Sequence, residues 1–205
     1  MTAKKPHHHG NLRAALIAAG LELLQAGGLE TLSMRKLAAK AGVSHAAPAH
    51  HFANLTALHS ALMTEGYKMF TDSMRAEMPL EPRDPRETIL AVGRGYLNFA
   101  LNNEGLFNLM FGGTPRDHND KGLNQAADEA YDVLREICAP IVKGEGGSQA
   151  NELMIWALIH GLARLVLHTK LGSLDTEQAF DTWRLILPPL EFSAYPSDIT
   201  NFLAK

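Results

Sequence analysis

The sequence has little of what marks secreted proteins and membrane proteins. Cys138 is the only cysteine in 205 residues, which excludes a disulfide framework within the chain and fits a reducing cytoplasm. No uninterrupted apolar run approaches the ~20 residues of a membrane span. No apolar stretch follows the lysines near the N-terminus, as a secretory signal requires. These absences predict a cytoplasmic protein that does not span a membrane.

Catalytic motifs are missing as well. The sequence has no G-x-S-x-G, H-E-x-x-H, P-loop or Rossmann fingerprint. We therefore expect neither an enzyme nor a cofactor, and a helical enzyme is the less favoured alternative. The histidine run at residues 7–9 does not predict a metal site, because consecutive residues near a chain end do not form a tetrahedral set of ligands.

Charge is unevenly distributed along the chain. The net charge is −3, but residues 1–66 carry six lysines and arginines against three glutamates, and the remainder is acidic. A mildly basic N-terminal part joined to an acidic body is expected of a small DNA-binding domain fused to a regulatory domain. Because the positive excess is small, we expect modest nonspecific DNA affinity that salt weakens steeply.

The positive evidence centres on residues 33–52, SMRKLAAKAGVSHAAPAHHF. Ser33 is suited to cap a helix, and Gly42 can take the left-handed conformation that ends it. Ser44 is then a second N-cap, which predicts another helix running towards Phe52. A helix, a short turn with glycine and a second helix form the helix-turn-helix pattern, whose second helix lies in the DNA major groove.

The surrounding sequence resembles the TetR family of transcriptional regulators. Residues 8–62 contain HHGNLR, then GVSHAAP followed by HF, and residues 156–161, WALIHG, resemble the WHG-type C-terminal domain of the same subgroup. The resemblance implies an all-α protein of about nine helices. A three-helix DNA-binding domain would cover residues 8–68, and a helical regulatory and dimerisation domain would cover residues 69–205.

Eight residues of the motif are candidates for DNA contact. Histidine can donate to guanine or phosphate, and alanine methyl groups can pack on thymine methyl groups. Two residues at the start of the first motif helix match family positions that meet phosphate or base. The alternative is that some of these side chains only face water or the helix bundle. The candidates are Ser33, Arg35, Ser44, His45, Ala46, Ala47, His50 and His51.

Two departures from the family pattern bear on DNA affinity. Ala49 stands where the family usually has Tyr, and Leu55 stands where it usually has Lys. Since both family residues usually contact the phosphate backbone, fewer phosphate anchors are expected here. The alternative function is therefore a TetR-fold binding module with weakened or lost DNA affinity.

Capping signals and periodicity predict the remaining helices. Asp84 and the capping box starting at Asp175 mark helix starts. Gly93 and Gly95, inside a helix, predict the close approach of a neighbouring helix or of a ligand, and Pro140 predicts a bend or break. The predicted helices cover about 11–25, 54–78, 85–102, 105–111, 121–142, 149–171 and 176–187.

The helix predicted over 149–171 is apolar on nearly every side, which predicts burial on every side. We expect it to form a homodimer together with the helix over 176–187. The resemblance implies a palindromic double-stranded operator and a small, mostly apolar effector that changes the spacing of the two DNA-binding parts. It leaves repression or activation open. The pocket candidates are Phe99, Phe107, Phe111, Trp156 and His160, although the stripe of His160, Arg164 and His168 also suits a dimer rim.

Overall fold

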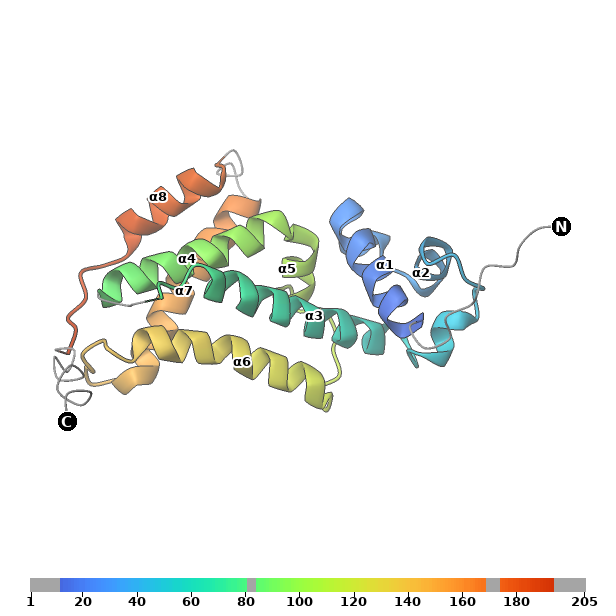
Figure 1. Ribbon diagram of the computed structural model, residues 1–205, viewed down its shortest axis with the longest axis horizontal. Coiled ribbons are helices and arrows are strands. Elements are labelled where there is room, and N and C mark those ends of the chain that lie inside the picture. The colour runs from blue at the N-terminus through green and yellow to red at the C-terminus, as the bar shows by residue number, and fades with distance from the viewer. Residues whose placement is uncertain (1–11, 81–83, 169–173, 194–205) are drawn as a thin grey trace. The chain divides into compact units, whose positions relative to one another are not determined.

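The computed structural model describes residues 12–80, 84–168 and 174–193. These residues form eight α-helices and two short 3-10 helices (Figure 1), with an isolated antiparallel bridge between Ile141 and Phe192. The predicted all-α class is confirmed. The histidine run at 7–9, the basic arm with Lys4 and Lys5, and the tail from residue 194 lie outside the described residues.

The chain forms two compact units, and neither is one continuous segment. Unit 1 is the chain up to Lys68 together with Asn103–Ala127, and unit 2 is Met69–Asn102 together with the chain from Asp128. Helices α3 and α6 are divided between the units. Unit 1 holds α1 (Leu12–Gly27), η1 (Leu29–Thr31), α2 (Met34–Lys40), η2 (Ala47–His50), α5 (Glu104–Phe111) and the first parts of α3 (Leu55–Ala76) and α6 (Lys121–Cys138).

The core of unit 1 forms where α1 packs against α2 and α5. Glycines allow the closest contacts. A side chain at Gly20 would press on Leu62 of α3, and one at Gly105 would overlap the backbone of Leu24 in α1. Helix α5 is therefore part of the same core as the N-terminal helices, which the sequence alone did not indicate.

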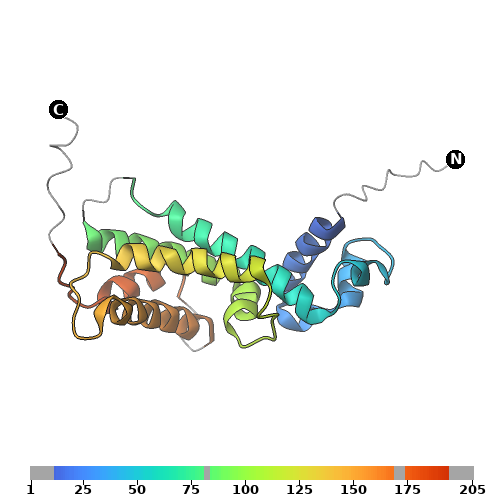
Figure 2. The same ribbon diagram turned by 90° about the horizontal axis from the view of Figure 1, so that it is seen from below.

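Unit 2 is organised around α4 (Pro85–Asn102), which packs against both α7 (Gly147–His168) and α8 (Thr176–Ile186) (Figures 1 and 2). A methyl group at Gly93 would overlap the indole of the fully buried Trp183, and one at Gly95 would overlap the backbone of Ser73. The prediction that these two glycines mark the close approach of neighbours is confirmed.

Helix starts follow the predicted capping chemistry. Asp84 Oδ1 accepts from the Arg86 backbone N–H at 2.8 Å, and Asn54 Oδ1 accepts from that of Ala57 at 2.9 Å. Asp175 and Gln178 form the predicted reciprocal capping box. These side chains satisfy amide groups that a helix start would otherwise leave without partners.

Two helix boundaries differ from the prediction. Helix α6 stops at Cys138, before Pro140, whose carbonyl instead accepts the backbone N–H of Ser193 at 2.9 Å. Helix α7 begins at Gly147, which has φ +66°, and residues 169–171 of the predicted helix lie outside the described part of the chain.

Helix α7 is the one helix among the described residues that meets the length and composition of a membrane span, which by itself is weak evidence for one. Its 22 residues are long and apolar enough to cross a bilayer by length and composition, because Glu152 and Arg164 are its only acidic or basic residues apart from histidines. A single helix of this kind is equally typical of a protein core or an interface between proteins. One side of α7 is buried and the other is not. The buried residues are Ile155, Ile159, Leu162, Ala163 and Val166, and the exposed large apolar residues are Leu153, Trp156 and Leu165.

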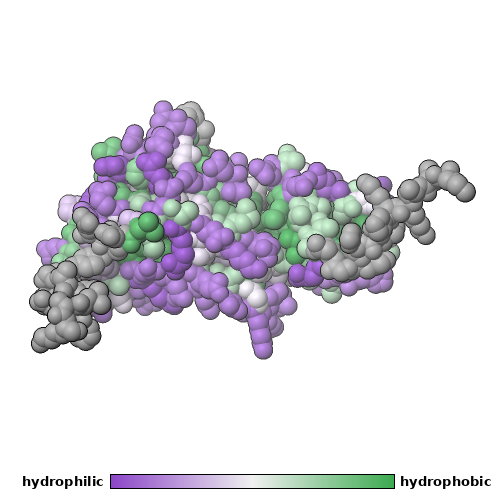
Figure 3. All heavy atoms as spheres, viewed as in Figure 1, coloured by the Kyte–Doolittle hydropathy of each residue, from purple (hydrophilic) through white to green (hydrophobic). Residues whose placement is uncertain are grey.

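Large apolar side chains reach the surface in both units. Figure 3 shows hydrophobic residues on the viewed face, among hydrophilic ones. In α7 Leu153 and Leu165 lie at the two ends of one four-residue row, and in α8 Leu185 and Ile186 are consecutive. No described part of the chain buries these side chains. The exposed large apolar residues include Leu29, Leu55, Leu80, Leu153, Leu165, Leu185 and Ile186.

Candidate nucleic-acid interface

Helix α2 carries the first part of the candidate interface. Ser33 is its N-cap, with Oγ accepting from the Lys36 backbone N–H at 3.2 Å, as predicted. Leu37 and Ala38 are fully buried against the rest of unit 1, whereas Arg35 and Lys36 are exposed. The buried face fixes the helix, so its first turn presents charged side chains to solvent.

A tight turn follows α2. Gly42 has φ +69°, the left-handed conformation that glycine adopts without strain. The backbone N–H of Val43 donates to Ala38 at 3.0 Å, and that of Gly42 donates to Ala39 at 3.2 Å. This pair of bonds is a Schellman motif. It ends α2 and turns the chain into the second element, as the sequence predicted.

The second element is not the α-helix that we predicted from Ser44. It is a 3-10 helix over Ala47–His50, its N-cap is Ala46, and no side chain caps it. Pro48 explains the difference, because it has no N–H to donate to the Ser44 carbonyl in an α-helical bond. That carbonyl accepts the N–H of Ala47 at 3.0 Å instead, three residues away.

Two buried residues hold this segment in place. Pro48 is buried, and Phe52 is 2% exposed, with the Arg13 guanidinium 5.5 Å from the centroid of its ring. The residues around them face outwards, and α2 and η2 pack together. The eight predicted contact residues therefore lie on two adjoining elements. Arg35, Ser44, His45, Ala46, His50 and His51 are exposed, and Ser33 and Ala47 are half-exposed.

Permanent positive charge on this surface is limited. Lys40 forms an ion pair with Glu22 at 2.7 Å, and Lys36 Nζ lies 3.5 Å from the Glu30 carbonyl. Among the residues that the structure describes, Arg35 makes no hydrogen bond or ion pair. Unlike Lys36 and Lys40, the Arg35 side chain can therefore bind an anion without breaking a contact within the described part of the protein.

Unit 1 also contains a group of polar contacts that sequence reasoning missed. The buried His59 of α3 donates from Nδ1 to the Pro115 carbonyl at 3.3 Å. The backbone N–H of Asp117 donates to Ser60 Oγ at 2.8 Å. Burial lowers the pKa of His59 despite this hydrogen bond. These contacts attach the loop between α5 and α6 to α3.

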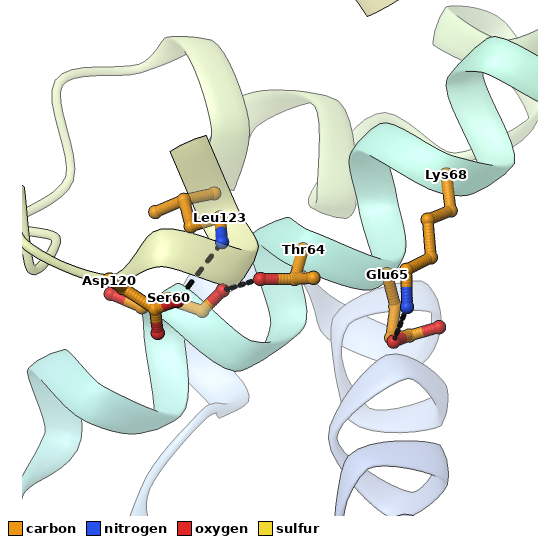
Figure 4. Close-up of polar contacts among 6 residues, drawn as sticks. All are labelled: Ser60, Thr64, Glu65, Lys68, Asp120 and Leu123. Atoms are coloured by element: carbon orange, nitrogen blue, oxygen red, sulfur yellow. Dashed lines mark hydrogen bonds and ion pairs between the residues drawn. The ribbon is translucent and has the colours of Figure 1, made fainter. Parts of the chain in front are cut away.

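Figure 4 shows the neighbouring polar contacts of α3 and α6. Thr64 Oγ1 donates to the Ser60 carbonyl at 2.8 Å, and the backbone N–H of Leu123 donates to Asp120 Oδ1 at 3.0 Å. One turn along α3, Lys68 and Glu65 form an ion pair at 2.9 Å. The contacts at Ser60 and Leu123 satisfy polar groups within α3 and at the start of α6, each local to its own helix.

The predicted pocket residues fall into two groups. Phe107 and Phe111 stack in unit 1 with ring centroids 4.9 Å apart. Phe99, Trp156 and His160 belong to unit 2, where the rings of Trp156 and His160 lie 6.4 Å apart. Two of the five predicted residues thus belong to unit 1 and three to unit 2.

The unit 2 cluster includes residues that sequence reasoning missed. Tyr96 of α4 places its hydroxyl 2.7 Å from His160 Nδ1, and Tyr131 of α6 donates to Glu152 Oε2 at 2.8 Å. Burial lowers the pKa of His160, and the nearby charge of Arg164 lowers it further. Tyr96 lies far from His160 in sequence, and Tyr131 lies far from Trp156, whose ring is 6.1 Å away, so only the fold reveals these neighbours.

Two family models match the chain. Residues 16–62 match the bacterial regulatory proteins of the tetR family, and residues 89–186 match the tetracyclin repressor-like C-terminal domain. The chain belongs to the TetR family. The matched N-terminal region includes α2, the Schellman turn and η2, so the exposed surface described above lies on the DNA-binding domain of a TetR-family transcriptional regulator.

Individual known proteins resemble the chain over most of its length. The nucleoid occlusion factor SlmA of Yersinia pseudotuberculosis serotype O:1b is 24% identical, covering 92% of this chain and 100% of that protein. A structure of a protein with unknown function from Rhodococcus sp. RHA1 is 29% identical with a TM-score of 0.72, covering 88% of this chain and 95% of that one.

A regulator with a bound ligand shares the fold. The transcriptional regulator FadR from Bacillus subtilis, solved in complex with stearoyl-CoA, has a TM-score of 0.64 at 16% identity. The match covers 82% of this chain and 94% of that one. At this identity the likeness shows that the fold is shared, and it does not transfer the ligand.

Proposed function

We propose that this TetR-family regulator is a repressor that binds a palindromic operator as a homodimer and leaves it when a small ligand binds. The observation that carries the proposal is the exposed surface on α2 and η2, held by the buried Pro48 and Phe52 within a TetR DNA-binding domain. A two-fold pair would present two such surfaces to successive major grooves, about 34–36 Å apart.

DNA contact is proposed for the outward-facing residues of this surface. Arg35 supplies a charged hydrogen-bond donor without a competing partner among the described residues. The exposed histidines can donate to base edges or phosphates, and the alanine methyl groups can pack on thymine methyl groups. The proposed contact residues are Ser33, Arg35, Ser44, His45, Ala46, Ala47, His50 and His51.

Dimerisation is proposed through α7 and α8. Leu153 and Leu165 of α7 are 51% and 49% exposed, and Leu185 of α8 is 85% exposed. A side chain added at Gly161, between the two exposed leucines, would meet nothing within 4 Å in the chain. Burying such side chains against a second copy removes apolar surface from water, which supports a two-fold interface.

The proposed effector site is the aromatic cluster of unit 2. Phe70 packs against Tyr96 and Phe99, with ring centroids 4.8 and 5.1 Å apart, and Tyr96 adds a hydroxyl bonded to His160. Apolar walls with few polar groups suit a small, mostly apolar molecule. The fold shared with FadR in complex with stearoyl-CoA supports an effector of this kind. Such a ligand releases DNA only if it binds the DNA-free conformation more tightly.

Selection of bound sequences from a random DNA library tests the proposal on the full-length protein. The expected result is enrichment of an inverted repeat whose half-sites are separated by about one helical turn or a related spacing. Absence of enrichment, together with no gel shift at low salt, would favour the alternative of a TetR-fold binding module without tight DNA binding. The exposed Ala49 and Leu55 favour that alternative.

A further inference from the structure

The second element of the DNA-binding motif carries histidines in place of permanent cations. No lysine or arginine lies between Lys40 and Lys68 in the sequence, whereas His45, His50 and His51 are all exposed. Histidine is the side chain whose charge ordinarily changes between about pH 5 and 8. Histidines are therefore the side chains of this second element that can carry positive charge, whereas the fixed cations lie on α2.

The three histidines are held on a short, well-anchored segment. Pro48 and Phe52 are buried between and after them, and the backbone N–H groups of His51 and Phe52 both donate to the Pro48 carbonyl, at 3.0 and 2.9 Å. Because the backbone is fixed, the exposed imidazoles can meet DNA phosphates without ordering a flexible loop. The cost in conformational entropy on binding is correspondingly small.

The charged groups of the adjoining elements are mostly cationic. Helix α2 contributes Arg35, Lys36 and Lys40, and α1 contributes Arg13 at the ring of Phe52. The only acidic side chain of α1 is Glu22, which is paired with Lys40. No Asp or Glu lies between Glu30 of η1 and Glu65 of α3. Helix α3 has one histidine, His59, which is buried and hydrogen-bonded to the Pro115 carbonyl.

An imidazolium on this surface would therefore have no nearby carboxylate to neutralise it in its own segment, and its natural counterion would be a phosphate of bound DNA. Phosphate contact favours the protonated form, and by linkage protonation favours phosphate contact to the same degree. The effect on affinity is largest when several histidines contact the backbone together.

We propose that DNA binding by this protein is coupled to proton uptake at His45, His50 and His51, so that operator affinity rises as pH falls from 8 to 6. The inference rests on the proposed function and adds a proton to it as a regulator of the same site. For each proton taken up on binding, lowering the pH by one unit raises the DNA affinity by up to about tenfold. Each further phosphate that an imidazolium neutralises makes the slope of the logarithm of the binding constant against the logarithm of salt concentration steeper by about 0.9.

The test uses the full-length protein and an operator duplex from the library selection. Fluorescence anisotropy gives Kd at pH 6, 7 and 8 over a series of salt concentrations, and circular dichroism checks folding at each pH. We expect Kd at pH 6 to be at least about tenfold lower than at pH 8, with a steeper salt slope. Calorimetry in two buffers of different ionisation enthalpy should show net proton uptake on binding at pH 7.

Variants locate the protons. Triple substitution of His45, His50 and His51 by Asn should abolish the proton uptake and flatten the pH dependence. His118→Asn is the matched control, since His118 is also exposed in unit 1 but lies in the loop between α5 and α6. It should behave as the unmodified protein does. If the triple variant no longer binds, proton uptake by the unmodified protein and by each single variant decides the question.

Three results would overturn the inference. One is DNA binding that is independent of pH with no proton uptake, which would leave the proposed function intact. Another is a pH dependence retained in the triple variant, or lost in His118→Asn. The third is failure to bind any DNA at any pH, which would remove the proposed function as well and is thereby distinguishable from the first two.

Discussion

The hydroxyl of Tyr96 lies 2.7 Å from Nδ1 of His160, which joins α4 to α7 inside unit 2. Burial lowers the pKa of His160 below its usual 6.5, and Arg164 adds to this effect. The lowered pKa favours the neutral imidazole at pH 7, and the imidazole tautomer decides which of the two groups donates in this hydrogen bond. Folding thus favours the neutral form of His160.

This relationship predicts how stability depends on pH. In the unfolded chain His160 takes up a proton near pH 6.5, whereas the folded protein resists it. The free energy of unfolding should therefore fall as pH drops below about 6.5. Burial lowers the pKa of His59 too, so it contributes with the same sign. Urea unfolding at pH 7.5 and 5.5 measures the drop, which His160→Gln should reduce and the exposed control His118→Gln should not. An equal drop in all three proteins would contradict the assignment.

Gly93 should not tolerate alanine, although alanine is the better helix former by about 1 kcal/mol. A methyl group there would overlap the indole of Trp183, which is fully buried. Overpacking of this kind costs about 1–3 kcal/mol, so we expect Gly93→Ala to be destabilised in urea unfolding. Gly122→Ala is the control: the position is exposed in the first turn of α6, the added methyl group would meet only the Asp120 side chain at 3.3 Å, and stability should not fall. A Gly93→Ala protein as stable as the original would show that α4 and α8 are not packed this closely.

A charge on the exposed side of α7 should weaken the proposed dimer. Leu165 is 49% exposed, and Leu165→Glu would place a carboxylate where the two copies meet. Sedimentation equilibrium should show self-association weakened by about tenfold or more, which corresponds to about 1.4 kcal/mol. The control is Leu80→Glu, because Leu80 is fully exposed outside α7 and α8. Equal association of both variants would place the interface elsewhere.

Restoring the two missing phosphate anchors should tighten DNA binding. Ala49 and Leu55 are both exposed. The double variant Ala49→Tyr, Leu55→Lys should lower Kd and, through the new lysine, steepen the salt slope by about 0.9 for one more neutralised phosphate. Leu29→Lys, the control, adds a charge at a position with the same 38% exposure as Leu55, but on η1. An unchanged Kd in the double variant would show that these positions do not meet DNA.

Cys138 should be chemically inert in the folded protein. Burial raises the pKa of its thiol to about 12, and the side chain is 1% exposed. Since the thiolate is the reactive form, modification by a disulfide reagent at pH 8 should be very slow in buffer and fast in concentrated guanidinium chloride. Comparable rates in both conditions would mean that unit 2 opens readily around α6.

Local signals allowed much of the fold to be predicted from the sequence. The caps at Ser33, Asp84 and Asp175 and the turn at Gly42 form as predicted, because each depends on the chemistry of a few consecutive residues. The glycine contacts at Gly93 and Gly95 were predictable in kind, but their partners, Trp183 and Ser73, were not.

What the sequence did not reveal depends on small energy differences or on distant contacts. One proline, Pro48, decides between an α-helix and a 3-10 helix in the recognition segment, a choice that a helix pattern alone does not make. The neighbours of His160 include Tyr96, which comes from a different helix. Only the fold brings such residues together. The sequence therefore indicated which aromatic residues are candidates for a pocket, but not which of them belong to the same unit.

The close fit of Gly105 against the backbone of Leu24 limits how this protein can be recombined with its relatives. A chimera joined once, after Lys68, would combine the DNA-binding helices of one parent with the α5 of another, and any residue larger than glycine at 105 would collide with α1. Working hybrids should therefore exchange residues 103–127 along with the N-terminal helices, using three junctions instead of one.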